Sequence, residues 1–277
     1  MPVSRTNIGA AFYLRRERRK KIFKLWFGAI LIIFIILSAA VAALARAEKF
    51  RINLVKVSGN LVLSEKEIVA FAGEILKRSY LGVFPKDNVF IYPEETLVSG
   101  LLEKYKRLKS AEISLSDGQV LNIKVEERKP FALWCGAKEP GDADKCFFMD
   151  DEGYVFSPAP DFSGSVFFRY YGLIEENPLG RQFLTSQKFE NLKFFTEGLK
   201  ELSLNPVSVF VGEIGVYKAY LRGGGAVIFD ESKDFGRLLQ DLRLAISGRE
   251  ELKEGDFSDL NYIDLRFGNK IFYKLKN

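Results

Sequence analysis

The chain has 277 residues and a formal net charge of +5 at pH 7, from 41 Lys and Arg against 36 Asp and Glu, with no histidine. The absence of histidine excludes Ser-His-Asp and Cys-His catalysis and histidine-ligated metal sites. The sequence also has no G-x-S-x-G, S-x-x-K or P-loop pattern, so we expect no enzyme, no cofactor and no small-molecule substrate.

Residues 1–24 form a basic tail. They carry eight Lys or Arg and one acid, Glu17, and so contribute +7, whereas the rest of the chain has 33 basic and 35 acidic residues, or −2. The basic character is therefore confined to the tail. A groove for DNA or RNA would need its positive charge on the folded body, so we expect no nucleic-acid binding.

Residues 25–45, LWFGAILIIFIILSAAVAALA, are 21 consecutive uncharged and mostly apolar residues. About 20 such residues cross the hydrocarbon core of a bilayer, which predicts one transmembrane helix. The basic tail before it predicts a cytoplasmic N-terminus, with the bulk of the chain outside the inner membrane.

A cleaved signal peptide is the alternative to this anchor. Ala43-Leu44-Ala45 and Ala45-Arg46-Ala47 both resemble cleavage sites, and cleavage would release the body as a secreted protein, such as a hydrolase. The long charged region and the long apolar run favour the anchor.

Residues 50–128 predict the element order β-α-α-β-β. The first strand begins at Phe50 and ends at Ser58-Gly59-Asn60, and Ser64 with Glu67 forms a capping box that opens the first helix. Pro93 suits the first position of the second helix, whose apolar stripe runs to Leu108. Two strands joined by a turn at Asp117-Gly118 complete the unit.

Residues 129–277 predict a second domain rich in strands. Two apolar stripes of helical period interrupt the strands, one with Ser186 as its candidate cap and one from Phe235 to Ile246, ending at Gly248. The predicted strands are Phe131–Trp134, Cys146–Met149, Val166–Tyr170, Val207–Val211, Tyr217–Leu221 and Ala226–Phe229.

Cys135 and Cys146 are the two cysteines of the chain, and they bracket a polar loop. Outside the inner membrane a disulfide between them is expected, with two unpaired thiols as the alternative. Two cysteines without histidine cannot build a usual zinc site, so we expect no metal.

The end of the chain predicts a β-hairpin. A three-residue loop, Gly268 to Lys270, would pair 267 with 271, 265 with 273 and 263 with 275, so that the apolar faces of both strands coincide. Phe272 and Lys274 then lie on the opposite face.

As the final element, this strand could lie at the edge of a sheet. Such an edge can accept a strand from another protein, with Phe272 as an anchor. In the alternative, Lys270, Lys274 and Lys276 protect the edge against aggregation.

Four segments resemble, in order and spacing, the FtsQ/DivIB family of bacterial cell-division proteins, which also have a basic tail and a single anchor. The segments are FRINLVKVSGNLVLSEKEI (50–68), AEISLSDGQVLNIKVEERKPFALW (111–134), FFMDDEGYVF (147–156) and YIDLRF (262–267). The chain departs from the family in its two cysteines, its short C-terminus and residues 162–185.

The resemblance implies an α+β fold. A short cytoplasmic tail (1–24) and one transmembrane helix (25–45) would precede a POTRA-like domain (50–128). A β-rich domain (129–277) with helices on one side would follow. The implied function is a non-enzymatic scaffold of the divisome at the division septum. The alternative is a membrane-anchored POTRA module of a secretion or envelope-assembly system.

The resemblance also implies partners, namely divisome membrane proteins of the FtsB/FtsL coiled-coil type. Carried over by position, the candidate contacts are Arg266, Phe267, Asn269, Lys270, Ile271, Phe272, Tyr273 and Lys274. Val57, Gly59 and Asn60 are secondary candidates, for which a strand exit before a capped core helix is the alternative.

Overall fold

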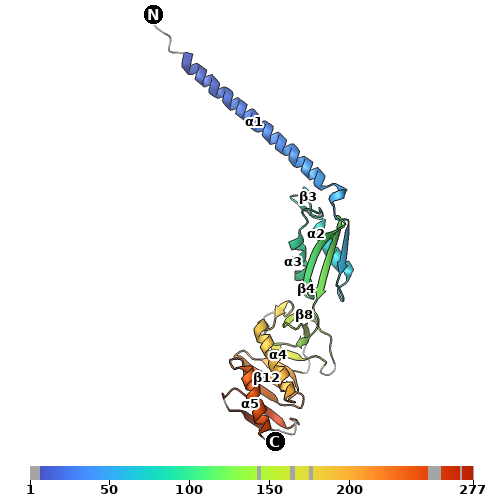
Figure 1. The fold of residues 1–277 in the computed structure, drawn as a ribbon, viewed down its shortest axis with the longest axis vertical. Coiled ribbons are helices and arrows are strands. Elements are labelled where there is room, and N and C mark those ends of the chain that lie inside the picture. Colours follow the sequence, from blue (N-terminus) through green and yellow to red (C-terminus); the bar gives the residue numbers. More distant parts are fainter. Residues whose placement is uncertain are drawn as a thin grey trace. The chain divides into compact units, whose positions relative to one another are not determined.

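The computed structural model describes residues 7–141, 145–162, 166–174, 177–248, 257–268 and 270–276. The fold is mixed α+β, with an N-terminal helix followed by regions rich in strands (Figure 1). The chain divides into two compact units. The first comprises Met1–Leu101 and Ala111–Val125, and the second comprises Leu102–Ser110 and Glu126–Asn277.

Helix α1 (Asn7–Ala45) begins earlier than predicted and includes most of the basic tail, where Arg and Lys are good helix formers. Its part from Lys20 to Ala45 is long and apolar enough to span a membrane, with a mean hydropathy of 2.9. Only 6% of that apolar stretch is buried within the protein. A surface of this kind is stable where lipid covers it.

The first unit contains the predicted order β-α-α-β-β, with a small hairpin inserted between the helices. Its three-stranded sheet has the order β1-β5-β4, with β1 parallel to β5. Ile68 and Ala72 of the first helix and Leu97 and Leu101 of the second are fully buried. The elements are β1 (Leu54–Ser58), α2 (Glu65–Leu76), β2 (Ser79–Tyr80), β3 (Phe84–Pro85), α3 (Glu94–Lys104), β4 (Leu108–Ser116) and β5 (Val120–Glu127).

Three details of the first unit differ from prediction. The first strand begins at Leu54, because residues 48–50 form a 3₁₀ turn. Ser64 is the N-cap of α2, but its side chain makes no capping hydrogen bond. Helix α3 ends at Lys104 rather than continuing to Leu108, because Leu108 is the first residue of β4 and is buried there.

The second unit contains one sheet of ten strands, in the order β10-β8-β7-β6-β9-β11-β12-β13-β14-β15. Each of the six predicted strands is present to within a few residues, whereas β8 and β10 were not predicted. The strands are β6 (Ala132–Trp134), β7 (Phe147–Met149), β8 (Tyr154–Pro158), β9 (Arg169–Gly172), β10 (Arg181–Gln182), β11 (Pro206–Val211), β12 (Val216–Leu221), β13 (Ala226–Asp230), β14 (Leu260–Asp264) and β15 (Phe272–Leu275).

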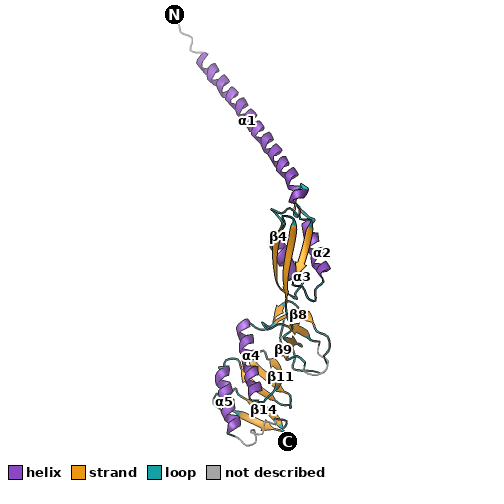
Figure 2. Ribbon diagram, turned by 45° about the vertical axis from the view of Figure 1, so that its right-hand side comes forward, coloured by secondary structure: helices purple, strands orange, loops and turns teal. Residues whose placement is uncertain are grey.

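Helices α4 (Ser186–Glu201) and α5 (Phe235–Ser247) lie side by side on one face of this sheet (Figure 2). Their apolar stripes pack on the strands and form one large core with them. In this core the ring centroids of Phe195 and Phe229 lie 4.2 Å apart. The N-cap of α4 is Thr185 rather than Ser186, and α5 ends before Gly248 as predicted.

The cysteines are joined as a disulfide on the other side of the sheet, where Cys135 is buried against Tyr171. The loop that the disulfide closes is held by Glu139, whose carboxylate accepts hydrogen bonds from Lys218 and from the Tyr220 hydroxyl. These two bonds lower the pKa of Glu139, although burial opposes them. Glu139 therefore attaches the loop to strand β12, in addition to the disulfide that closes it.

Candidate partner-binding edge

The sheet of the second unit ends at its C-terminal hairpin. Strand β14 runs parallel to β13, and β15 pairs with β14 in the antiparallel direction. Strand β15 is last in the order of ten strands, so no described strand lies on its outer side. An outer strand presents backbone N–H and C=O groups to which another strand can pair.

The register of this hairpin differs from the predicted one by two residues. Ile263 pairs with Tyr273 rather than with residue 275, and Asp264 pairs with Phe272. The connecting segment is therefore residues 265–271 rather than the three residues 268–270. Because the shift is an even number, the residues keep their faces, and Tyr273 still packs against the core that contains Ile263.

Asp264 explains why pairing stops early. Its carboxylate accepts hydrogen bonds from the Arg266 backbone N–H (3.1 Å) and from Arg266 Nε and Nη2 (2.9 and 2.6 Å). The next residue, Leu265, donates its N–H to Ile228 on β13 (2.8 Å). The chain after Asp264 is thus held by its own turn and by β13, and it leaves β15.

Asp264 is a buried carboxylate, with 5% of its surface exposed. Burial alone would raise its pKa, but the hydrogen bonds and the positive charge of Arg266 outweigh burial, so the pKa is lowered below its ordinary value. The guanidinium of Arg266 is therefore committed to this turn. Its role at the edge is to position the connecting segment.

At pH 7, we expect Asp264→Asn to lower the free energy of unfolding by about 1–2 kcal/mol, because the two bonds to the Arg266 guanidinium lose the negative charge of their acceptor. The pKa of Asp264 is lower in the folded state, so its contribution is complete above about pH 4 and is lost as the pH falls through the folded value. Urea denaturation should therefore show the two proteins converging in stability below about pH 4. Asp259→Asn, at an exposed neighbour, is the control and should track the wild type throughout.

Two aromatic side chains cover the exposed side of the hairpin. Phe267 is 55% exposed and Phe272 is 49% exposed, and their rings meet edge to face with centroids 5.2 Å apart. The guanidinium of Arg266 lies 5.6 Å from the Phe267 ring. Lys270 and Lys274 are exposed beside them. We call Phe267, Lys270, Phe272, Lys274 and the backbone of β15 the C-terminal edge.

The direction of the β15 backbone groups follows from one hydrogen bond. Lys276 donates its N–H to the Asp259 carbonyl (2.7 Å), toward β14. Neighbouring residues of a strand point their backbone groups to opposite sides, so those of Leu275 point to the outer side. The C-terminal edge therefore combines outward backbone groups with an aromatic pair and two cations.

The predicted contact residues thus divide by position. Phe267, Lys270, Phe272 and Lys274 are exposed on the C-terminal edge, whereas Ile271 and Tyr273 are half-buried and pack on the core. Asn269 lies outside the described residues.

The secondary candidates occupy the end of β1. Val57 pairs with Ile123 on β5, and Asn60 donates from its side-chain amide to the Leu63 carbonyl (2.9 Å). Gly59 has φ +84°, and a Cβ there would lie 2.0 Å from the Val125 carbonyl oxygen, so only glycine fits. All three have structural roles, and the exposed apolar side chains at this turn are those of Leu61 and Val62, which were not predicted.

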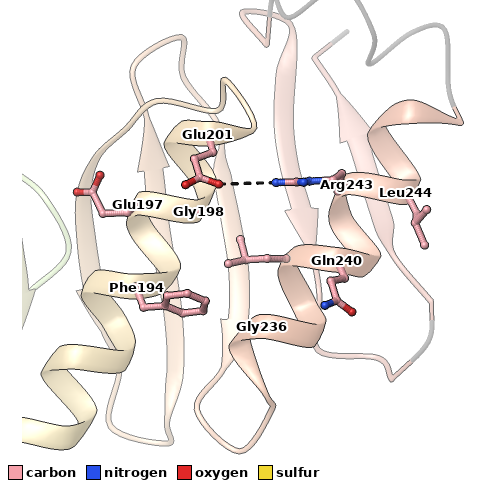
Figure 3. Close-up of a pocket in the computed structure, with 9 residues that line it drawn as sticks. Phe194, Glu197, Gly198, Glu201, Gly236, Gln240, Arg243 and Leu244 are labelled. Carbon is pink, nitrogen blue, oxygen red and sulfur yellow. Dashed lines mark ion pairs between the residues drawn. The ribbon is translucent and has the colours of Figure 1, made fainter.

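A second surface lies between α4 and α5 (Figure 3). Gly198 lets the helices approach closely, since a Cβ there would lie 2.3 Å from Leu239. Phe194 is exposed on α4, and Glu201 forms an ion pair with Arg243 across the groove (3.6 Å). The groove has charges of both signs and no backbone groups to pair, so it lacks the features of the C-terminal edge.

No family model and no curated protein matches the sequence. Within the described ranges, no group of three or more His, Cys, Asp or Glu could hold a metal ion.

Proposed function

We propose that this protein is a non-enzymatic scaffold of the bacterial division septum, anchored in the inner membrane by α1 with its N-terminus in the cytoplasm. In this role the second unit binds a coiled-coil membrane protein of the FtsB/FtsL type. The work of the protein is ordered recruitment and control of septum-forming proteins rather than catalysis.

The observation that carries the proposal is the position of β15. A strand added along β15 would pair with outward backbone groups, such as those of Leu275, and its side chains would reach Phe272. Exposed Lys270 and Lys274 suit a partner segment with acidic side chains, because complementary charge speeds association and selects the partner.

The first unit supports the same proposal through its topology. We propose that its β-α-α-β-β order, with β1 parallel to β5, is a POTRA-like domain that recruits further partners. Its outer strand β4 has nine residues, which also favours the second candidate, an anchored POTRA module that pairs with strands of envelope proteins. The two candidates differ in which strand binds the partner, β15 or β4.

Two substitutions at one position test strand addition. Leu275→Pro removes an outward N–H, whereas Leu275→Ala keeps that N–H and shortens only the side chain. We expect the proline variant of the full chain in detergent to bind an FtsB-like protein at least about tenfold more weakly. The alanine variant should stay within about threefold of wild type. Biolayer interferometry measures both, with circular dichroism as the check of folding.

Equal weakening by proline and alanine would show that side-chain contact, not strand addition, holds the partner. Undiminished binding by the proline variant would remove β15 from the binding site and leave β4 as the candidate strand.

A further inference from the structure

The hairpin β2–β3 of the first unit has an unusual residue at its tip. The Val83 N–H donates to the Tyr80 carbonyl (3.0 Å), and the two residues between them, Leu81 and Gly82, have φ +51° and +69°. Positive φ at both central positions is the geometry of a type I′ turn, in which Asn, Asp or Gly is favoured first. Leucine is strained there and contributes no polar group to the turn.

The Leu81 side chain is also 95% exposed, so packing within the protein does not explain it. A strained, exposed leucine is unfavourable in water, but it would gain from a neighbouring apolar medium. The position of Leu81 therefore indicates an apolar contact with another molecule.

Leu81 is part of a larger exposed apolar surface. Phe90 is 75% exposed, and Val83 and Ile91 are each more than one-third exposed in the same short segment. We call Leu81, Val83, Phe90 and Ile91 the hairpin patch. Exposed apolar residues gathered in this way mark an interaction surface, in contrast to single scattered ones.

Hydrogen bonds attach this segment to the end of the membrane-spanning stretch. The buried Asn88 donates from its side-chain amide to the carbonyl of Ala45 (2.8 Å), the last residue of α1. The Arg46 guanidinium donates to the Gly82 carbonyl (3.5 Å), and the Val89 N–H donates to the Phe50 carbonyl (2.9 Å). Figure 1 shows β3 beside the C-terminal end of α1.

These contacts fix the position of the hairpin patch relative to a bilayer that α1 spans. Where α1 spans a bilayer, Ala45 marks the level at which the chain leaves the hydrocarbon core. A segment bonded to Ala45 and Arg46 then lies at the headgroup layer. The same segment has the composition of an interfacial anchor, with Tyr80 under the Lys86 ammonium (4.9 Å).

We propose that the hairpin patch inserts into the outer leaflet of the membrane that α1 spans, with Leu81 and Phe90 reaching the boundary between headgroups and acyl chains. This inference rests on the proposed anchoring by α1. Two attachments, the helix and the hairpin patch, would hold the first unit against the lipid surface, whereas a helix alone would leave it free to turn.

Spin labelling tests the insertion without background, because both native cysteines are consumed in the disulfide. Single cysteines replace Leu81, Phe90, Leu61 or Ile33 in the full chain, each is labelled with a nitroxide, and the protein is reconstituted in phosphatidylethanolamine–phosphatidylglycerol vesicles. Relaxation by oxygen, which concentrates in lipid, is compared with relaxation by a water-soluble nickel chelate. We expect oxygen to dominate at Leu81 and Phe90, as at Ile33 within α1.

Leu61 is the matched control, since it is also a highly exposed apolar residue (79%) but lies just beyond the C-terminal end of β1, outside the hairpin patch. We expect the nickel chelate to dominate there. Chelate-dominated relaxation at Leu81 and Phe90 with an oxygen-dominated Ile33 would overturn the insertion and leave the anchor standing. Chelate-dominated relaxation at Ile33 as well would overturn both.

Discussion

Replacing Asp150 with alanine is expected to lower the free energy of unfolding of the second unit by about 3–5 kcal/mol, since it leaves a buried charge without its partner. Asp150 is 2% exposed, and its carboxylate is bonded to the guanidinium of Arg128. The same carboxylate accepts the backbone N–H groups of Glu152 (3.0 Å) and Tyr154 (2.9 Å), and the guanidinium lies 4.0 Å from the Tyr154 ring. One side chain therefore holds a turn, an arginine and the start of β8.

Trp134 allows this loss to be measured in the second unit alone. In a fragment of residues 48–277, which lacks Trp26, it is the only tryptophan; it is buried in β6, so its fluorescence in urea reports on that unit. Asp151→Ala removes an exposed carboxylate at the next position and should change the stability by less than about 0.5 kcal/mol. Equal stability of the two variants would show that the buried ion pair does not hold the turn.

Phe272→Asp is expected to weaken binding of the proposed coiled-coil partner by about 100-fold or more. The side chain is half exposed on the outer strand, where an added strand would bury it, and a buried charge without a partner is strongly unfavourable. Phe272 pairs with Asp264, so the new carboxylate lies opposite a like charge, and circular dichroism checks that the free protein remains folded. Affinity for the FtsB-like protein is the measurement.

Phe194→Asp is the matched control for this variant, because Phe194 is a similarly exposed phenylalanine in the groove between α4 and α5. The control should bind the partner as the wild type does. The reverse result, with binding lost in Phe194→Asp and kept in Phe272→Asp, would move the partner site to the helical groove.

Local patterns in the sequence predicted most of the fold. The stripes of α4 and α5, the end of α5 at Gly248 and six strands of the large sheet follow from periodicity and turn residues. Strands β2, β3 and β10 have only two residues each. They are too short to show an alternation of apolar and polar residues.

The C-terminal edge shows where local patterns fail. Alternation correctly placed Phe272 and Lys274 on the outer face, but turn rules predicted a loop of residues 268–270 where residues 265–271 connect the strands, and the pairing register differs by two residues. The difference arises from the local turn that the Asp264–Arg266 pair closes and from a backbone bond to β13, which is a tertiary contact. The secondary candidate Gly59 is likewise explained only by the closeness of Val125.

The most direct test of the proposed scaffold is a pull-down with two baits. One is the full chain, and the other is a chain that ends at Phe267 and so lacks β15. The prey is the extracytoplasmic part of the same organism's FtsB-like coiled-coil protein, and circular dichroism confirms that both baits are folded. Binding by the full chain and its loss on truncation is the predicted result. Equal binding by both chains would contradict a site on β15, and binding by neither would contradict the proposed partner.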